Sequence, residues 1–118
     1  MQDITIIVNG APYGTESPYN ALRLASALIR GERKANVHLF LISDAVFSAN
    51  KGQDVPEGYY STEKMIAGVI KNGASVQLCG TCCRARGLTS EQIVEGASIS
   101  SMIELANHVM ESDKVISF

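Results

Sequence analysis

Short β-rich apolar runs alternate along this chain with longer segments whose apolar residues recur at helical spacing. The four runs cover residues 4–8, 37–42, 75–79 and 114–118. The second run is almost continuously apolar, which is typical of a strand covered on both faces. This alternation predicts a three-layer α/β/α sandwich around a mostly parallel sheet of about five strands, joined by right-handed crossovers.

Local signals predict where the helices begin and end. Ser17, which a proline follows, is expected to be the N-cap of the first helix. Thr89 opens a capping-box pattern, which predicts a short helix that closes at Gly96. The long connection after the second apolar run is expected to be functional or mobile, unless a short helix around residues 45–49 divides it, because loops of more than ~15 residues are uncommon in compact domains.

Length and composition restrict the class of protein. The 118 residues fit one domain, residues 1–118, and 46% of them are hydrophobic. Ten basic and twelve acidic residues give a net charge of −2, which argues against nucleic acid as a direct partner. No apolar run approaches the ~20 residues of a membrane span, and the N-terminus has no signal-peptide pattern. We therefore expect a cytoplasmic protein without a membrane partner.

All three cysteines, Cys79, Cys82 and Cys83, lie within five residues of one another. Such a cluster is a poor disulfide framework, because a disulfide stabilises most when it closes a long loop. In a reducing compartment it indicates thiol chemistry or metal binding. Cys79 ends a predicted strand, at the edge where open α/β sheets place their sites. The alternative for Cys79 is a small buried hydrophobe.

Other candidate site residues are expected near Cys79. Asn9 and Gly10 follow the first predicted strand and Asp44 follows the second, so parallel strands would bring them to the same edge. Arg84 and Arg86 lie just after the cysteines, and nearby positive charge lowers the pKa of a thiol. These five residues are the candidate supporting residues of a thiol site.

The CxxC spacing of Cys79 and Cys82 also raises the questions of a thioredoxin-like site and of zinc. A thioredoxin-like site needs a later proline, whereas all three prolines precede this motif. A structural zinc site needs four ligands, and only His38 and His108 remain as candidates, so we expect no metal. His38 is expected in the core or in an interface, and His108 on the solvated side of the last helix.

Four segments carry a family resemblance: Asn-Gly-Ala-Pro-Tyr-Gly at 9–14, Leu-Ile-Ser-Asp-Ala-Val at 41–46, Leu-Cys-x-x-Cys at 78–82, and Arg-Gly at 86–87. In their order and spacing they resemble the DsrE/DsrF-like family, and within it the YchN-like subgroup, over essentially the whole chain. The resemblance implies a DsrE-like α/β sandwich, assembly into homotrimers or homohexamers, and a role in sulfur relay. Exposed edge strands and abundant apolar residues also favour a homo-oligomer.

The resemblance further implies a chemistry for the thiols. Relatives in the family accept sulfur as a persulfide on a cysteine at the end of the third strand, a position that Cys79 matches. Cys82 fits the subgroup's CxxC pattern and is spaced to act as a resolving thiol, whereas Cys83 is outside the sulfur-carrying pattern. The implied partners are proteins that donate and accept sulfur, and no metal or organic cofactor is required.

Three functions therefore remain open. The first is a persulfide carrier with sulfurtransferase-like activity on Cys79. The second is a dithiol redox protein that cycles Cys79 and Cys82 as a disulfide. The third is a non-enzymatic oligomeric module that binds a small ligand or a partner protein.

Overall fold

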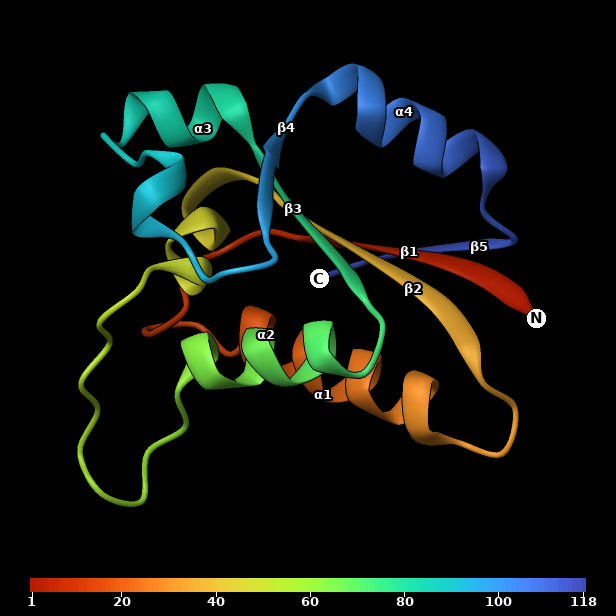
Figure 1. Ribbon diagram of the computed structural model, residues 1–118, viewed down its shortest axis with the longest axis horizontal. Coiled ribbons are helices and arrows are strands. Elements are labelled where there is room, and N and C mark those ends of the chain that lie inside the picture. Colours follow the sequence, from red (N-terminus) through yellow and green to blue (C-terminus); the bar gives the residue numbers. More distant parts are fainter.

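A computed structural model describes residues 1–118 and contains a single parallel sheet of five strands in the order β4-β3-β2-β1-β5 (Figure 1). The strands are β1 (Gln2–Val8), β2 (Ala35–Leu41), β3 (Ser75–Cys79), β4 (Ser98–Ser100) and β5 (Lys114–Ser117). The helices are α1 (Ser17–Arg30), α2 (Thr62–Lys71), α3 (Gly80–Ala85) and α4 (Met102–Glu111), with 3-10 helices η1 (Ser43–Ala49) and η2 (Ser90–Gln92). The predicted α/β class and parallel sheet are confirmed.

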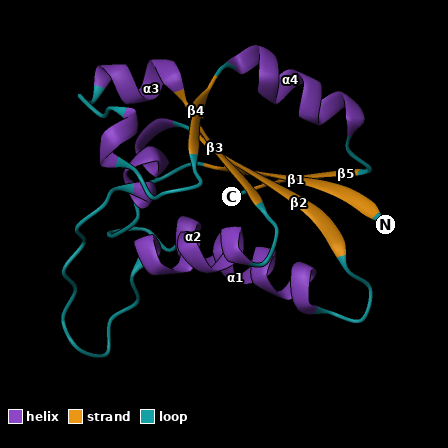
Figure 2. Cartoon of the chain, in the orientation of Figure 1, coloured by secondary structure: helices purple, strands orange, loops and turns teal.

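The helices cover the two faces of the sheet unequally. Figure 2 shows α1 and α2 side by side on one face and α4 on the other, while α3 follows β3 at its carboxyl end. The main core of 21 buried residues involves α1 and α2, whereas only Phe40, Cys79 and Leu105 are buried together beneath α4. None of the helices is long and apolar enough to cross a membrane.

The register explains why the second apolar run is almost continuous. Leu39 and Leu41 pack into the main core, while Phe40, between them, packs with Leu105 of α4 on the opposite face. Alternate residues of a strand point to opposite faces, so a central strand covered on both sides needs apolar residues at successive positions.

Two elements are absent from the sequence-based prediction, α3 and β4. Strand β4 has only three residues and pairs with β3 through the register of Leu78 with Ile99. Helix α3 has six residues and begins at Gly80, where the sequence suggests a loop because glycine is a poor helix former. Pairing with β3 therefore sets β4, while α3 follows Cys79 directly.

Two predicted helix boundaries are wrong. Helix α1 begins at Ser17 itself, so Glu16 is its N-cap and no side chain caps it. The capping box at Thr89 forms, but η2 ends at Gln92 instead of continuing to Gly96. The chain becomes extended there because Val94 donates a backbone hydrogen bond to the Ala49 carbonyl (2.8 Å). Of the two alternatives for the long connection, the structure shows the short helix around residues 45–49, which is η1.

The prediction for His108 is also wrong, because this residue is half-buried. Its ring stacks on His38 with 4.6 Å between centroids, and its Nε2 lies 3.1 Å from Gln77 Oε1. The difference arises because α4 is the helix that covers this face of the sheet. It lies close to the strands, so its histidine packs against them.

Candidate functional site

The three thiols lie close together in sequence but occupy different environments. Cys79 is the last residue of β3 and is 5% exposed. Cys82 lies in α3 and is half-buried, whereas Cys83 is fully buried in the main core. All three are free thiols. Burial removes Cys83 from contact with a substrate, and Cys79 and Cys82 are the two that reach a pocket.

This pocket has a volume of about 560 Å³ and lies between α3 and the start of α4. Cys79 and Cys82 line it together with Ser100, Ser101 and Met102. Binding sites for small ligands commonly have volumes of about 300–1,000 Å³. The hollow is therefore large enough for a small sulfur compound or for the end of a partner's side chain.

Gly80, the residue after Cys79, permits the close approach of β4. A Cβ atom at this position would lie 2.9 Å from the carbonyl oxygen of Ser100 and 3.3 Å from Ile99 Cγ2. A larger residue would push α3 and β4 apart and deform the pocket. The glycine in the CxxC motif therefore has a steric role.

Ser43 is not among the candidate site residues predicted from the sequence, but it contributes directly to the thiol site. It is the one non-glycine residue with a left-handed backbone, at φ 53°. Its backbone N–H donates a hydrogen bond to Cys82 Sγ over 3.2 Å. Backbone strain of this kind persists only where the surrounding structure enforces it, and it is concentrated at functional sites. Its sequence signal is weak, since it is only a serine that ends an apolar run.

The surroundings of Cys82 favour its protonated form. Burial raises the pKa of the Cys82 thiol, and the adjacent Cys79 thiol raises it further. The Ser43 N–H and the Arg86 guanidinium pull this pKa down without reversing the shift. The Ser43 N–H is thus the hydrogen-bond donor that the structure provides to the Cys82 sulfur, with the Cys79 thiol beside it.

The third thiol, that of Cys83, is expected to be unreactive. Burial raises the pKa of Cys83, and its neighbours Cys79 and Cys82 raise it further. A buried, protonated thiol is a poor nucleophile, because the thiolate is the reactive form.

Arg86 links η1 to α3 beside Cys82. Its Nε donates to Asp44 Oδ1 over 2.9 Å, and its Nη1 donates to the Cys82 carbonyl over 3.1 Å. Two of the candidate supporting residues, Asp44 and Arg86, are therefore brought together at the thiols. Arg84 also lines the pocket, where it is exposed and forms no ion pair.

The structure does not bring Asn9 and Gly10 into this pocket. The backbone N–H and the side-chain amide of Asn9 both donate to the Phe118 carbonyl, over 2.9 Å and 3.2 Å. Gly10 adopts φ 82°, and a Cβ there would lie 3.0 Å from Thr15 Oγ1. These residues hold the C-terminus and shape the turn after β1. No cluster of three or more His, Cys, Asp or Glu side chains is arranged to bind a metal ion.

Comparisons with known proteins identify the family. A profile of the DsrE/DsrF-like family matches residues 2–118. Protein YchN of Escherichia coli K12 is 42% identical over 118 residues, all of both chains, and its crystal structure matches with a TM-score of 0.94. A protein of Methanopyrus kandleri is 44% identical over 98% of this chain and 93% of its own. Sulfurtransferase TusD of Serratia proteamaculans is 26% identical over the whole of both chains. The chain therefore belongs to the DsrE/DsrF-like family, in its YchN-like subgroup.

Proposed function

We propose that this protein is a sulfur-relay protein that carries sulfur as a persulfide on Cys79. The observation that carries the proposal is the pair of neighbouring thiols, Cys79 and Cys82, which share one open pocket while Cys83 is buried. The family membership supports a relay function, as does the name sulfurtransferase of the distant relative TusD. We place the protein in the cytoplasm, between a protein that donates sulfur and one that accepts it.

Loading would be a thiol exchange at a sulfane sulfur. The Cys79 thiolate attacks the outer sulfur of a donor persulfide, R–S–SH, and a new S–S bond forms on Cys79 as the donor's S–S bond breaks. The donor leaves as a thiolate and takes up a proton. Cys79 then carries –S–SH, and neither protein is oxidised or reduced overall.

Unloading can follow two routes from this state. An acceptor thiolate that attacks the outer sulfur removes it as a new persulfide and regenerates Cys79. Alternatively, the Cys82 thiolate attacks the inner sulfur, so that a Cys79–Cys82 disulfide forms and hydrosulfide leaves. In this second route the sulfane sulfur is reduced to sulfide while the two thiols are oxidised to a disulfide. The raised pKa of Cys82 slows this route and favours transfer to an acceptor.

A dithiol redox pair is the second candidate function. The shared pocket of Cys79 and Cys82 favours it as well, because the two thiols are already neighbours. In this case the two thiols would lose two protons and two electrons to a disulfide of another protein, which would leave as two thiols. No sulfur atom would be added.

The intact mass of the non-reduced protein, before and after exposure to a sulfane-sulfur donor, separates these functions. A persulfide carrier gains mass in steps of one sulfur atom, and reduction removes the gain. A dithiol redox protein loses two hydrogens and gains no sulfur. A protein with neither change would leave the binding module as the best explanation and would contradict both thiol functions.

Single cysteine variants test the role of each thiol in this measurement. Cys79→Ser should not load, whereas Cys82→Ser should load and hold the persulfide longer than the wild type, because the resolving thiol is missing. Cys83→Ala is the matched control, since it removes a thiol from the same helix without changing the pocket. Loading of Cys79→Ser at the wild-type level would overturn the assignment of Cys79.

We also propose that the protein is a homo-oligomer, a trimer or a hexamer. Helix α4 supports this, because Met102, Ile103 and Met110 on its surface are 58%, 73% and 85% exposed. Large apolar side chains gathered on one element commonly mark a protein interface. The mass in solution at micromolar concentration tests the proposal, and a monomer would contradict it.

A further inference from the structure

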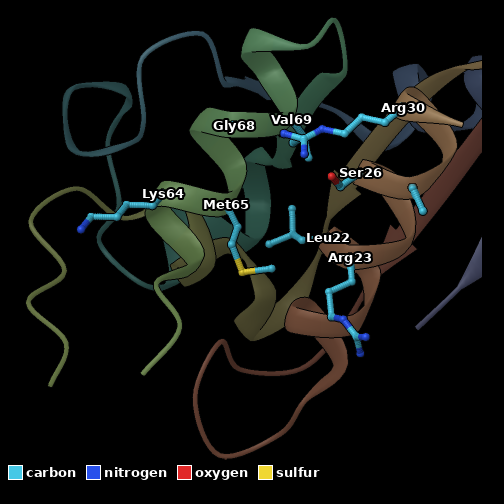
Figure 3. Close-up of a pocket in the computed structure, with 9 residues that line it drawn as sticks. Leu22, Arg23, Ser26, Arg30, Lys64, Met65, Gly68 and Val69 are labelled. Carbon is cyan, nitrogen blue, oxygen red and sulfur yellow. The ribbon is translucent and has the colours of Figure 1, made fainter. Parts of the chain in front are cut away.

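A second hollow lies on the opposite face of the sheet from α4, and the sulfur chemistry does not use it. It has a volume of about 490 Å³ and runs between α1 and α2. Figure 3 shows Leu22 of α1 and Met65 of α2 pointing into it from opposite sides. Leu22 is buried and Met65 half-buried, so the floor of this α1–α2 groove is apolar.

The rim of the groove is cationic. Arg23 and Arg30 on α1 and Lys64 on α2 line it, and no acidic residue does. None of these cations takes part in either ion pair of the chain. The nearby acid Glu63 is engaged elsewhere, since its carboxylate accepts from the backbone N–H groups of Gly52 and Gln53. A protein of net charge −2 thus presents a local positive field at this groove.

The two rim cations on α1, Arg23 and Arg30, lie beside other side chains of the same helix. Arg23 is held in place, since its Nη1 donates to Asn20 Oδ1 over 3.1 Å and its guanidinium lies over the Tyr19 ring. Arg30 extends from α1 toward α2, and the Ser26 hydroxyl lies one turn before it on the same side of the helix (Figure 3). A guanidinium and a hydroxyl at this spacing can bind one carboxylate or phosphate group together.

Gly68 supplies a second and independent observation. It lies inside α2, where glycine is among the poorest helix formers, and its backbone angle does not require glycine. A Cβ atom at this position would meet nothing within 4 Å. Packing within the chain therefore does not explain this glycine, whereas an occupant of the groove that approaches the α2 backbone would.

We propose that the α1–α2 groove binds a small amphipathic organic anion. Its acidic group would pair with Arg30 and Ser26, and its apolar part would lie along Leu22, Met65 and Gly68. The volume is within the range of small-ligand sites. Neither Cys79 nor Cys82 lines the groove, so this site is independent of the sulfur chemistry.

Titration of the whole protein with decanoate and with octyl phosphate tests the proposal, by calorimetry and by amide chemical shifts in α1 and α2. We expect saturable binding of at least one of these anions, with shifts centred on the groove. Decanol and decyltrimethylammonium, which match decanoate in chain length and have no negative charge, should bind at least about tenfold more weakly than decanoate. Equal binding of the neutral or cationic probe would overturn the proposal, as would no saturable binding of either anion.

Three variants locate the site. Arg30→Gln should weaken anion binding by about tenfold or more, and Gly68→Leu should abolish it by filling the groove while α2 stays helical. Lys71→Gln is the control, because it removes a cation from α2 outside the groove and should bind as the wild type. Unchanged binding by Arg30→Gln and Gly68→Leu would overturn the proposal. It would also fall if the groove's shifts changed with protein concentration alone, because a second copy would then be the occupant.

Discussion

The backbone N–H of Ser43 donates a hydrogen bond to Cys82 Sγ over 3.2 Å, although 39 residues separate the two in sequence. Ser43 has a left-handed backbone at this point, and the ion pair of Arg86 with Asp44 joins the adjoining segments. The environment of the CxxC motif is thus set by residues that follow two different strands.

Arg86 is expected to control the reactivity of Cys82. This guanidinium lowers the pKa of the Cys82 thiol, so Arg86→Gln should raise that pKa further and leave less thiolate at a given pH. Alkylation of Cys82, followed peptide by peptide by mass spectrometry, should slow by about two- to fivefold. The effect is modest because Arg86 is partly exposed to solvent.

Arg84→Gln is the matched control for this measurement. It removes the same charge two residues away, from a side chain that has no ion pair. Its alkylation rate at Cys82 should stay closer to that of the wild type. Equal slowing by both variants would mean that general charge, and not the contact of Arg86, governs the thiol.

The two helical glycines Gly80 and Gly68 are expected to respond in opposite directions to replacement by alanine. Gly80→Ala places a methyl group against the Ser100 carbonyl and should lower the free energy of unfolding by about 1–3 kcal/mol. Gly68→Ala adds a methyl group that meets nothing and should raise it by about 0.5–1 kcal/mol. Denaturant unfolding measures both. A stabilising Gly80→Ala would contradict the close approach of β4.

The histidine stack predicts a loss of stability in mild acid. Burial and the neighbouring His108 lower the pKa of His38 below 6.5, against weaker opposing effects of Asp3 and Glu111. The unfolded chain, with His38 at its ordinary pKa, binds more protons in the window between the two values. The contribution of His38 to the free energy of unfolding should therefore be fully present above about pH 6.5. It should be lost as the pH drops through this window.

Proton NMR of the His38 ring measures this directly, with a titration midpoint expected below 6.5. His108→Gln removes the neighbouring imidazole that lowers the pKa of His38 and should move the midpoint upward. His38→Gln should remove this residue's share of the pH dependence of unfolding. A midpoint at or above 6.5 would show that α4 does not cover His38 in solution.

The apolar surface of α4 is expected to hold the oligomer together. Ile103→Glu or Met110→Glu would place a charge in a buried contact and should shift the mass in solution toward the monomer. Lys71→Glu changes the charge by two units on α2 and serves as the control. Sedimentation measures the mass of all three variants in solution. An intact oligomer in both Ile103→Glu and Met110→Glu would exclude α4 as the interface.

Much of the fold follows from short-range patterns in the sequence. The runs that became β1, β2 and β3 were apolar enough to predict buried parallel strands. Serine is also a favoured N-cap residue, and Ser61 accepts a hydrogen bond from the Lys64 N–H at the start of α2. A parallel sheet brings the carboxyl ends of its strands to one edge, so Cys79 and Asp44 could be placed at the same edge from the sequence alone.

The sequence could not predict elements and contacts that depend on pairing between distant residues. Strand β4 exists because it pairs with β3, and Val94 is extended because it bonds to Ala49. The burial of Cys83 and the stacking of His108 on His38 depend on which helix covers which face of the sheet.

By itself, the sequence determined the α/β class, the family and the cluster of thiols at the end of the third strand, because propensity, periodicity and spacing are local properties. Only the tertiary structure decided which thiols reach the pocket and that Ser43 and Arg86 act on Cys82. It also excluded Asn9 and Gly10 from that pocket. Burial and hydrogen bonding across 39 residues arise only when separate segments pack together, and no local pattern records them.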